Sequence, residues 1–175
     1  MAGDHDAFAE LARASIGRLY AIAQLILRDH AQAEEATQEA LVAAWRDLAA
    51  LRDPDRFEAW VYRLLVRACH REARRARRWP TIDVAVRGIE PVEPDGSVVL
   101  GDRDQLERGF RRLDPDQRAV IVLHFYVGLP LTEVAGVLRI PEGTAKSRLH
   151  RATRSLRAAL EADARVPLMN EGRPA

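Results

Sequence analysis

Hydrophobic residues recur every three or four positions along most of the chain, which is the spacing of one face of a helix. This spacing predicts helices over residues 5–28 (one long helix or two short ones), 31–48 and 56–78. No stretch shows a convincing strand pattern, so the sequence predicts an all-α fold. The expected inward positions include Phe8, Leu11, Leu19, Ile22, Ile26, Ala33, Ala40, Ala44, Trp45, Phe57, Trp60, Val61, Leu64, Leu65 and Ala68. In the first helix Ile16, Tyr20 and Leu25 widen the apolar side, which favours contact with more than one neighbour.

The most informative pattern lies near the C-terminus. Residues 131–138 predict a short helix, which a tight turn joins to a second helix over about residues 144–157. This is the helix-turn-helix arrangement, whose second helix fits the DNA major groove. The apolar stripe of that helix is Ala145, Leu149, Ala152, Leu156 and Leu160, and its opposite face carries Lys146, Ser147, His150, Arg151 and Arg154. Arginine and lysine read guanine edges, so the pattern favours DNA binding over a helical hairpin with a solvated basic face.

The overall charge does not indicate a nucleic-acid-binding protein, because 27 basic and 26 acidic residues leave a formal net charge of +1. The charges are segregated, however: residues 1–50 are acidic on balance, and residues 56–78 are rich in arginine. Arginines at 63, 67, 71, 74 and 78 form one helical stripe, where a solvated face would interleave acids. The stripe therefore favours a nucleic-acid contact. The chain has a single lysine, so a GC-rich genome could also explain why arginine is abundant, and only its placement carries information.

Composition changes after Trp79, where proline, glycine and acidic residues replace large apolar ones. This stretch is too long for a connection inside one compact domain. We therefore expect a first domain over residues 1–79, an acidic extended linker over 80–103, a second domain over 104–161 and a flexible tail over 162–175. In the second domain, Asp114 followed by Pro115 is typical of a helix start.

Several function classes find no support in the sequence. The single cysteine, Cys69, excludes an internal disulfide and suits a reducing compartment. No apolar run reaches membrane-spanning length and the N-terminus is acidic, so we expect a cytoplasmic protein without membrane insertion. The five histidines lack metal-ligand spacing, and no phosphate loop or nucleophile arrangement occurs. We therefore expect no metal, no cofactor, no catalytic residue and no enzyme activity.

Two groups of motifs resemble one protein family. Leu113-Asp114-Pro115-Asp116-Gln117-Arg118, the stretch 128–135 (GLPLTEVA) and the stretch 140–152 (IPEGTAKSRLHRA) resemble domain four of bacterial sigma factors of the extracytoplasmic-function (ECF) group, in the sigma-70 family. The stretch 33–40 (AEEATQEA), Trp45-Arg46, Phe57 and the stretch 60–63 (WVYR) resemble domain two. The likeness runs from about Phe8 to Leu160 and includes the linker. It implies a sigma factor that binds core RNA polymerase and directs promoter-specific transcription initiation.

The resemblance also implies a role for each surface. Domain two would bind the clamp coiled coil of the polymerase β′ subunit through Glu35, Gln38, Glu39 and Arg46. It would read and melt the −10 element, as a single strand, through Arg56, Arg63, Arg67, His70, Arg71, Arg74, Arg75 and Arg78. Domain four would bind the double-stranded −35 element through Thr144, Lys146, Ser147, Arg148, His150, Arg151 and Arg154. The other implied partners are the β flap and an anti-sigma factor, and in holoenzyme the protein would be associated with the nucleoid.

Some positions depart from the family pattern. Arg67 and Arg71 stand where asparagine and aspartate are common, and Ala145 replaces a usual valine. Arg139 replaces a frequent glycine, at a cost of about 1 kcal/mol if its φ is positive. We expect Phe57 and Trp60 in the core rather than stacked on bases. The alternative function is a helix-turn-helix regulator that binds DNA alone, with residues 1–79 as a sensor or dimerisation domain.

Overall fold

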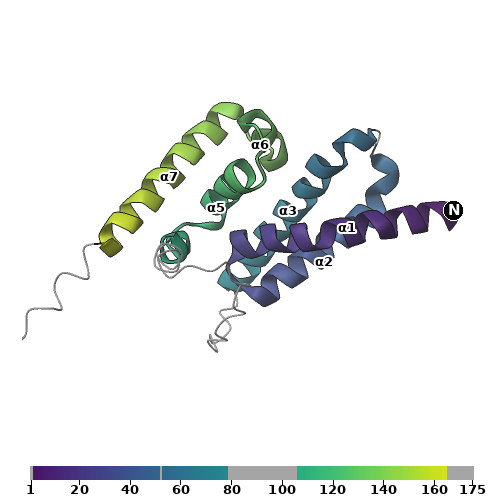
Figure 1. Ribbon diagram of the computed structural model, residues 1–175, viewed down its shortest axis with the longest axis horizontal. Helices are drawn as coiled ribbons and strands as arrows, with labels where there is room; N and C mark the ends of the chain where they lie inside the picture. Colours follow the sequence, from purple (N-terminus) through teal and green to yellow (C-terminus); the bar gives the residue numbers. More distant parts are fainter. Residues whose placement is uncertain (1, 52, 79–105, 165–175) are drawn as a thin grey trace, which may run out of the picture.

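The structure is a computed structural model, and it describes residues 2–51, 53–78 and 106–164 of the chain. These ranges contain helices and short turns and no strand, which confirms the all-α prediction. Figure 1 shows the helices in two groups, one N-terminal and one C-terminal, that lie against each other. No helix in the described ranges combines the length and the apolar character that a bilayer crossing requires.

The N-terminal group contains three helices. Helix α1 spans Ala2–Leu27 as a single element, α2 spans His30–Asp47 and α3 spans Phe57–Arg78. Two short 3-10 turns, Leu48–Ala50 and Pro54–Arg56, connect α2 to α3. The start of α2 is fixed by Asp29, whose carboxylate accepts a hydrogen bond of 2.7 Å from the backbone N–H of Gln32.

The core of this group combines large side chains from α1 and α3 with small ones from α2. The large side chains are fully buried and include Leu19, Ile22, Ile26, Tyr62 and Leu65. The buried side of α2 is formed mainly by Ala33, Ala36, Ala40 and Ala44, each 0 % exposed. Short side chains let neighbouring helix axes approach closely, so α2 lies tightly between its partners.

Two predicted core residues lie at the surface instead. Leu11 is 43 % exposed and Trp45 is 38 % exposed, so their prediction as core positions was wrong. The Phe8 and Trp45 rings are 5.1 Å apart and tilted by 57° at the rim of a groove between α1 and α2. The groove is lined by these two helices alone, so none of the other described helices covers its apolar side chains.

The C-terminal group begins with a helical segment at residues 106–111. Helix α5 (Pro115–Ile121) continues into a π-helical turn, Val122–Tyr126, and α6 (Leu131–Leu138) and α7 (Glu142–Ala164) follow. The predicted cap at Asp114 is confirmed: its carboxylate accepts from the Gln117 N–H, and the Gln117 side chain accepts from the Asp114 N–H. Helix α7 runs three residues into the predicted tail, whereas residues 165–175 and the predicted linker, 80–103, lie outside the described residues.

The turn between α6 and α7 contains the residue that departs from the family pattern. Arg139 has φ 55° and ψ 45°, in the left-handed region. Its N–H donates to the Gly136 carbonyl (3.4 Å), and the Ile140 N–H donates to the Ala135 carbonyl (3.0 Å). These two bonds form a Schellman motif, whose left-handed position is usually occupied by glycine. The fold thus places an arginine where an L side chain is strained.

We predict that Arg139→Gly raises the free energy of unfolding by about 0.5–1 kcal/mol, because glycine adopts the left-handed conformation without steric cost. The matched control is Arg139→Ala, which removes the long side chain but keeps Cβ. It should stay within about 0.5 kcal/mol of the original chain. Urea unfolding followed by circular dichroism measures both variants. Equal stabilities for the glycine and alanine variants would contradict the strain at this turn.

Candidate nucleic-acid interface

The outer face of α7 presents an unbroken group of hydrogen-bond donors. Ala145 and Ala152 on the inner face are 0 % exposed, and they seat α7 against the rest of the C-terminal group. The polar residues predicted on the opposite face are all exposed: Lys146, Ser147, His150, Arg151 and Arg154. The helix is anchored by these alanines together with the partly buried Leu149 and Leu156, and its cationic side chains at positions 146, 151 and 154 are exposed on the other side.

Some side chains of this face are oriented by their own helix. The Ser147 hydroxyl donates to the Thr144 carbonyl (3.0 Å), so its oxygen lone pairs can accept hydrogen bonds from a ligand. Arg151 Nε lies 3.4 Å from the Ser147 carbonyl, a long contact that only weakly orients the guanidinium. Thr144, at the start of the helix, is half-buried.

Arg148 differs from the other predicted −35 residues. Its side chain is only 22 % exposed, and Nη2 lies 3.6 Å from Oδ2 of Asp116, near the start of α5. The guanidinium is therefore partly matched by an acid of the protein itself. In this arrangement Arg148 is less accessible to DNA than its neighbours on α7.

The arginine stripe of α3 is exposed along most of its length. Arg67, Arg74 and Arg78 are exposed, whereas Arg63 is half-buried and its Nε has no hydrogen-bond partner among the described residues. Arg56 precedes the helix, on the second 3-10 turn, and its side chain is 81 % exposed. The contact from Arg56 to Asp53 is long, at 3.9 Å, and contributes little.

Acids do reach this stripe, contrary to the sequence prediction. Arg71 Nη2 lies 2.6 Å from Oε1 of Glu39, which belongs to α2. Arg75, which is outside the stripe, lies 3.9 Å from Glu72 of its own helix. The spacing argument compared residues on one helix only, whereas Glu39 comes from the neighbouring helix. The Glu39–Arg71 pair joins a predicted clamp-binding residue to a predicted −10 residue.

His70 points to the C-terminal group rather than to open solvent. Its side chain is 24 % exposed, and Nε2 lies 2.9 Å from Oδ1 of Asp116. The contact with His70 is the main reason why the pKa of the Asp116 carboxyl is lowered. The charges of Arg148 and Arg77 lower this pKa further, while burial of the carboxyl acts in the opposite direction. Asp116 is therefore a carboxylate at neutral pH, with cationic groups around it.

The two aromatic residues at the start of α3 occupy an intermediate position. Phe57 and Trp60 are half-buried and pack against the core, with ring centroids 6.1 Å apart and planes tilted by 48°. They are core residues in part, as expected, but each keeps an exposed portion. An unstacked base could pack against that portion.

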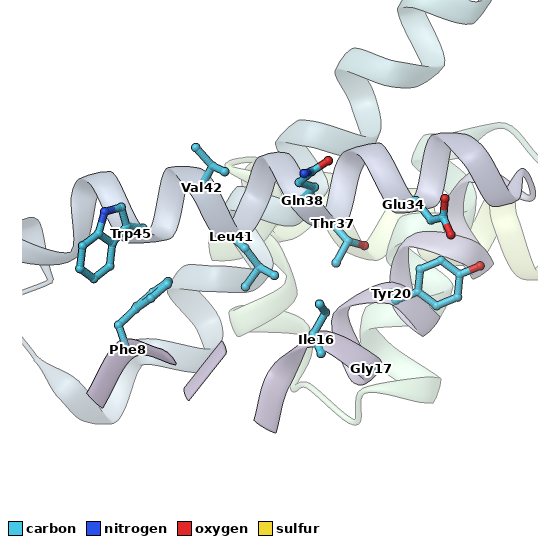
Figure 2. Close-up of a pocket in the computed structure, with 10 residues that line it drawn as sticks. All are labelled: Phe8, Ile16, Gly17, Tyr20, Glu34, Thr37, Gln38, Leu41, Val42 and Trp45. Atoms are coloured by element: carbon cyan, nitrogen blue, oxygen red, sulfur yellow. The ribbon is translucent and has the colours of Figure 1, made fainter. Parts of the chain in front are cut away.

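Helix α2 presents the residues predicted to bind the polymerase clamp. Glu35, Gln38 and Arg46 are exposed, and Glu39 is half-buried beside Arg71. Gln38 also belongs to the groove between α1 and α2, which has a volume of about 780 Å³. Figure 2 shows the lining side chains, which are mostly apolar. They are Phe8, Ile16, Tyr20, Glu34, Thr37, Gln38, Leu41, Val42 and Trp45, together with Gly17.

The groove was not predicted from the sequence, although one signal pointed to it. Ile16 and Tyr20 widen the apolar side of α1 beyond what one partner helix can cover. In the structure both line the groove, and Ile16 is 49 % exposed, as is Val42 across from it on α2. Exposed apolar side chains that gather in one place are typical of a protein-binding surface.

Comparison with known proteins gives the family of both helical groups. Residues 11–79 match the family described as Sigma-70 region 2, and residues 103–156 match Sigma-70, region 4. The chain is 32 % identical over 152 residues to the ECF RNA polymerase sigma factor SigM of Mycobacterium tuberculosis, an alignment that covers 87 % of this chain and 76 % of SigM.

Two solved structures extend the likeness to three dimensions. The first is the sigma factor RpoE of Bartonella quintana in complex with the anti-sigma factor NepR. It has a TM-score of 0.69 and 25 % identity, over 89 % of this chain and 98 % of that one. The second, CnrH in complex with the cytosolic domain of CnrY, has a TM-score of 0.63 and 27 % identity, over 93 % and 92 % of the two chains. With both sigma regions present in order and a SigM likeness that spans most of each protein, the chain belongs to the ECF sigma factors of the sigma-70 family, which are transcription initiation factors and not enzymes.

Proposed function

We propose that this chain binds core RNA polymerase in the cytoplasm and directs it to promoters by binding the −35 element with α7 and by reading and melting the −10 element with α3. The observation that carries the proposal is the outer face of α7, where Lys146, Arg151 and Arg154 are exposed over a buried alanine stripe. A rigid helix with long donors on one face has the shape and the chemistry to read base edges in a major groove.

The −10 role is supported by the surface of α3. Exposed arginines follow the helix from Arg67 to Arg78, and the half-buried Phe57 and Trp60 lie at its other end. Single-stranded DNA is held by a cationic track together with aromatic or apolar surfaces on which bases stack. Helix α3 supplies both, so it suits an unpaired strand better than a duplex.

The polymerase contact is supported by α2. Its exposed polar residues, Glu35, Gln38 and Arg46, stand beside the apolar groove, so the surface offers both charge and hydrophobic area. A groove of this kind accommodates one face of a partner helix, and the clamp of the β′ subunit is a coiled coil. The β flap is the expected partner of the C-terminal group.

An anti-sigma factor is the second proposed protein partner. RpoE was solved in complex with the anti-sigma factor NepR and CnrH in complex with the cytosolic domain of CnrY, and both share the fold over about nine-tenths of this chain. Inhibition by a separate protein is compatible with the exposed groove, because a competitor for the polymerase contact needs an accessible apolar surface.

We predict that Lys146→Ala, Arg151→Ala and Arg154→Ala each weaken promoter use and leave polymerase binding intact. A base contact should cost roughly 1–3 kcal/mol and relax the preference at one position, whereas a phosphate contact should weaken all sequences alike. Run-off transcription with core polymerase on genomic fragments measures the effect. Arg157→Ala, an exposed change farther along α7, is the control. Unchanged −35 preference in all three variants would refute the role of α7.

We predict that Gln38→Lys lowers affinity for core polymerase at least about tenfold without unfolding the chain, because Gln38 is exposed in the proposed contact. Glu39→Gln tests the next residue of the same proposed contact. It removes the exposed Glu39–Arg71 ion pair and should lower the free energy of unfolding by less than about 1 kcal/mol. Co-purification with core polymerase is the readout.

The control for the polymerase contact is Ala14→Lys, which adds the same charge at an exposed position of α1 outside the groove. Retention of polymerase by both α2 variants at the level of this control would place the contact elsewhere. Tight DNA binding by the free chain that core polymerase does not alter would instead favour a regulator that acts alone.

A further inference from the structure

One carboxylate lies between the two helices that are proposed to bind DNA. Asp116 belongs to the first turn of α5, between α3 and α7 in the arrangement of Figure 1. His70 from α3 lies 2.9 Å from one of its oxygens, and Arg148 from α7 lies 3.6 Å from the other. A predicted −10 residue and a predicted −35 residue therefore share a single negative charge.

Other polar contacts join the same two groups of helices. Arg118 Nη1 donates to the Ile26 carbonyl of α1 (2.7 Å), and a second bond within its own group, from Nε to the Leu113 carbonyl (2.9 Å), holds the guanidinium in place. Ile26 lies in the last turn of α1, where carbonyls lack partners within the helix and attract cations. Arg28, directly after α1, forms an ion pair with Glu107 of the C-terminal group.

The contact between the groups is also apolar. Buried residues of both groups form one continuous cluster, to which Leu27 contributes from the N-terminal group and Leu113 from the C-terminal group. Helices α5 and α6 both pack on α3, and α5 also packs on α1. The first helix of the helix-turn-helix thus lies against the helix that is proposed to read the −10 element.

This closed arrangement cannot coexist with binding to both promoter elements. The −35 and −10 elements are centred on the order of 25 base pairs apart. At 3.4 Å per base pair, this separation is about 85 Å of DNA duplex. His70 lies 2.9 Å from one oxygen of the Asp116 carboxylate and Arg148 lies 3.6 Å from the other, so the two side chains are far closer together than the promoter elements are. The two groups of helices must separate before each can reach its own element.

We infer that Asp116 is an intramolecular latch: in the free chain its carboxylate occupies His70 and Arg148 in place of DNA phosphate and holds the two groups of helices closed. The inference rests on the proposed function, since it takes α3 and α7 as the DNA-binding helices. When the two groups of helices separate, DNA phosphate replaces the Asp116 carboxylate beside His70 and Arg148. Only open molecules can bind DNA in this way, so the apparent DNA affinity of the free chain falls as the closed fraction rises.

The test uses the full chain with Glu10→Cys on α1 and Arg157→Cys on α7, both exposed, as sites for a donor and an acceptor dye. Cys69 is buried, and burial raises the pKa of its thiol to about 12, so it should not compete for the dyes. Energy transfer then reports whether the groups are closed. Binding of a short mixed-sequence duplex at low salt reports the accessible cationic surface.

Asp116→Asn should lower the transfer efficiency of the free chain and raise its duplex affinity roughly threefold to tenfold. Glu161→Gln is the matched control, because it removes the same charge from an exposed position of α7 that takes no part in the latch. A transfer efficiency or an affinity equal to that of the control would overturn the inference. If Asp116→Asn loses its helical circular dichroism, Asp116→Ala, which places the residue of highest helix propensity inside the helix, decides the question by the same criteria.

Failure of the latch and failure of the proposed function are distinguishable. Energy transfer is measured on the free chain and requires neither polymerase nor a promoter. The proposed function is tested by transcription with core polymerase, where the original chain must initiate RNA synthesis. A chain that initiates but shows no effect of Asp116→Asn refutes the latch alone, and a chain that never initiates refutes the function.

Discussion

The buried alanines of α2 and α7 determine where the polar surfaces of this protein lie. Ala33, Ala40 and Ala44 in α2, like Ala145 and Ala152 in α7, are 0 % exposed. A helix seated through methyl groups lies close to its support, so its longer side chains are left on the outer face. In α2 the buried side is formed mainly by alanines, whereas α7 adds the partly buried Leu149 and Leu156 to its two buried alanines. Larger residues of α1, α3 and α5 supply most of the remaining core volume.

Features set by local sequence were predictable. The cap at Asp114, the bounds of α6 and the outer face of α7 depend on residues within one or two turns of each other, and the structure contains all three. The strain at Arg139 was expected only if the residue had a positive φ, and it was the family resemblance that marked this position as one where glycine is frequent. The structure supplies the positive φ, in a Schellman turn that needs a left-handed residue.

Features set by distant contacts were not predictable from spacing. Trp45 fits the inward stripe of α2, but a stripe is buried only where other elements cover it fully. At this end the Phe8 ring of α1 packs on Trp45 and still leaves it 38 % exposed. Glu39 reaches Arg71 from another helix, and Asp116 reaches His70 across 46 residues of sequence. Periodicity along one helix contains no information about such partners. The near-neutral total charge was the only sign that the basic residues have acidic counterparts.

That charge balance has a functional consequence. A chain with 27 basic and 26 acidic residues has little long-range attraction for DNA, so non-specific binding by the free protein is weak. Arg71 and Arg148 contact the internal acids Glu39 and Asp116, so these two cations become available to DNA only when those contacts open. A protein that acts through polymerase gains from this property, because polymerase supplies the encounter with DNA. The near-neutral charge therefore suits a protein that polymerase delivers to DNA, where local basic faces such as that of α7 supply the contacts.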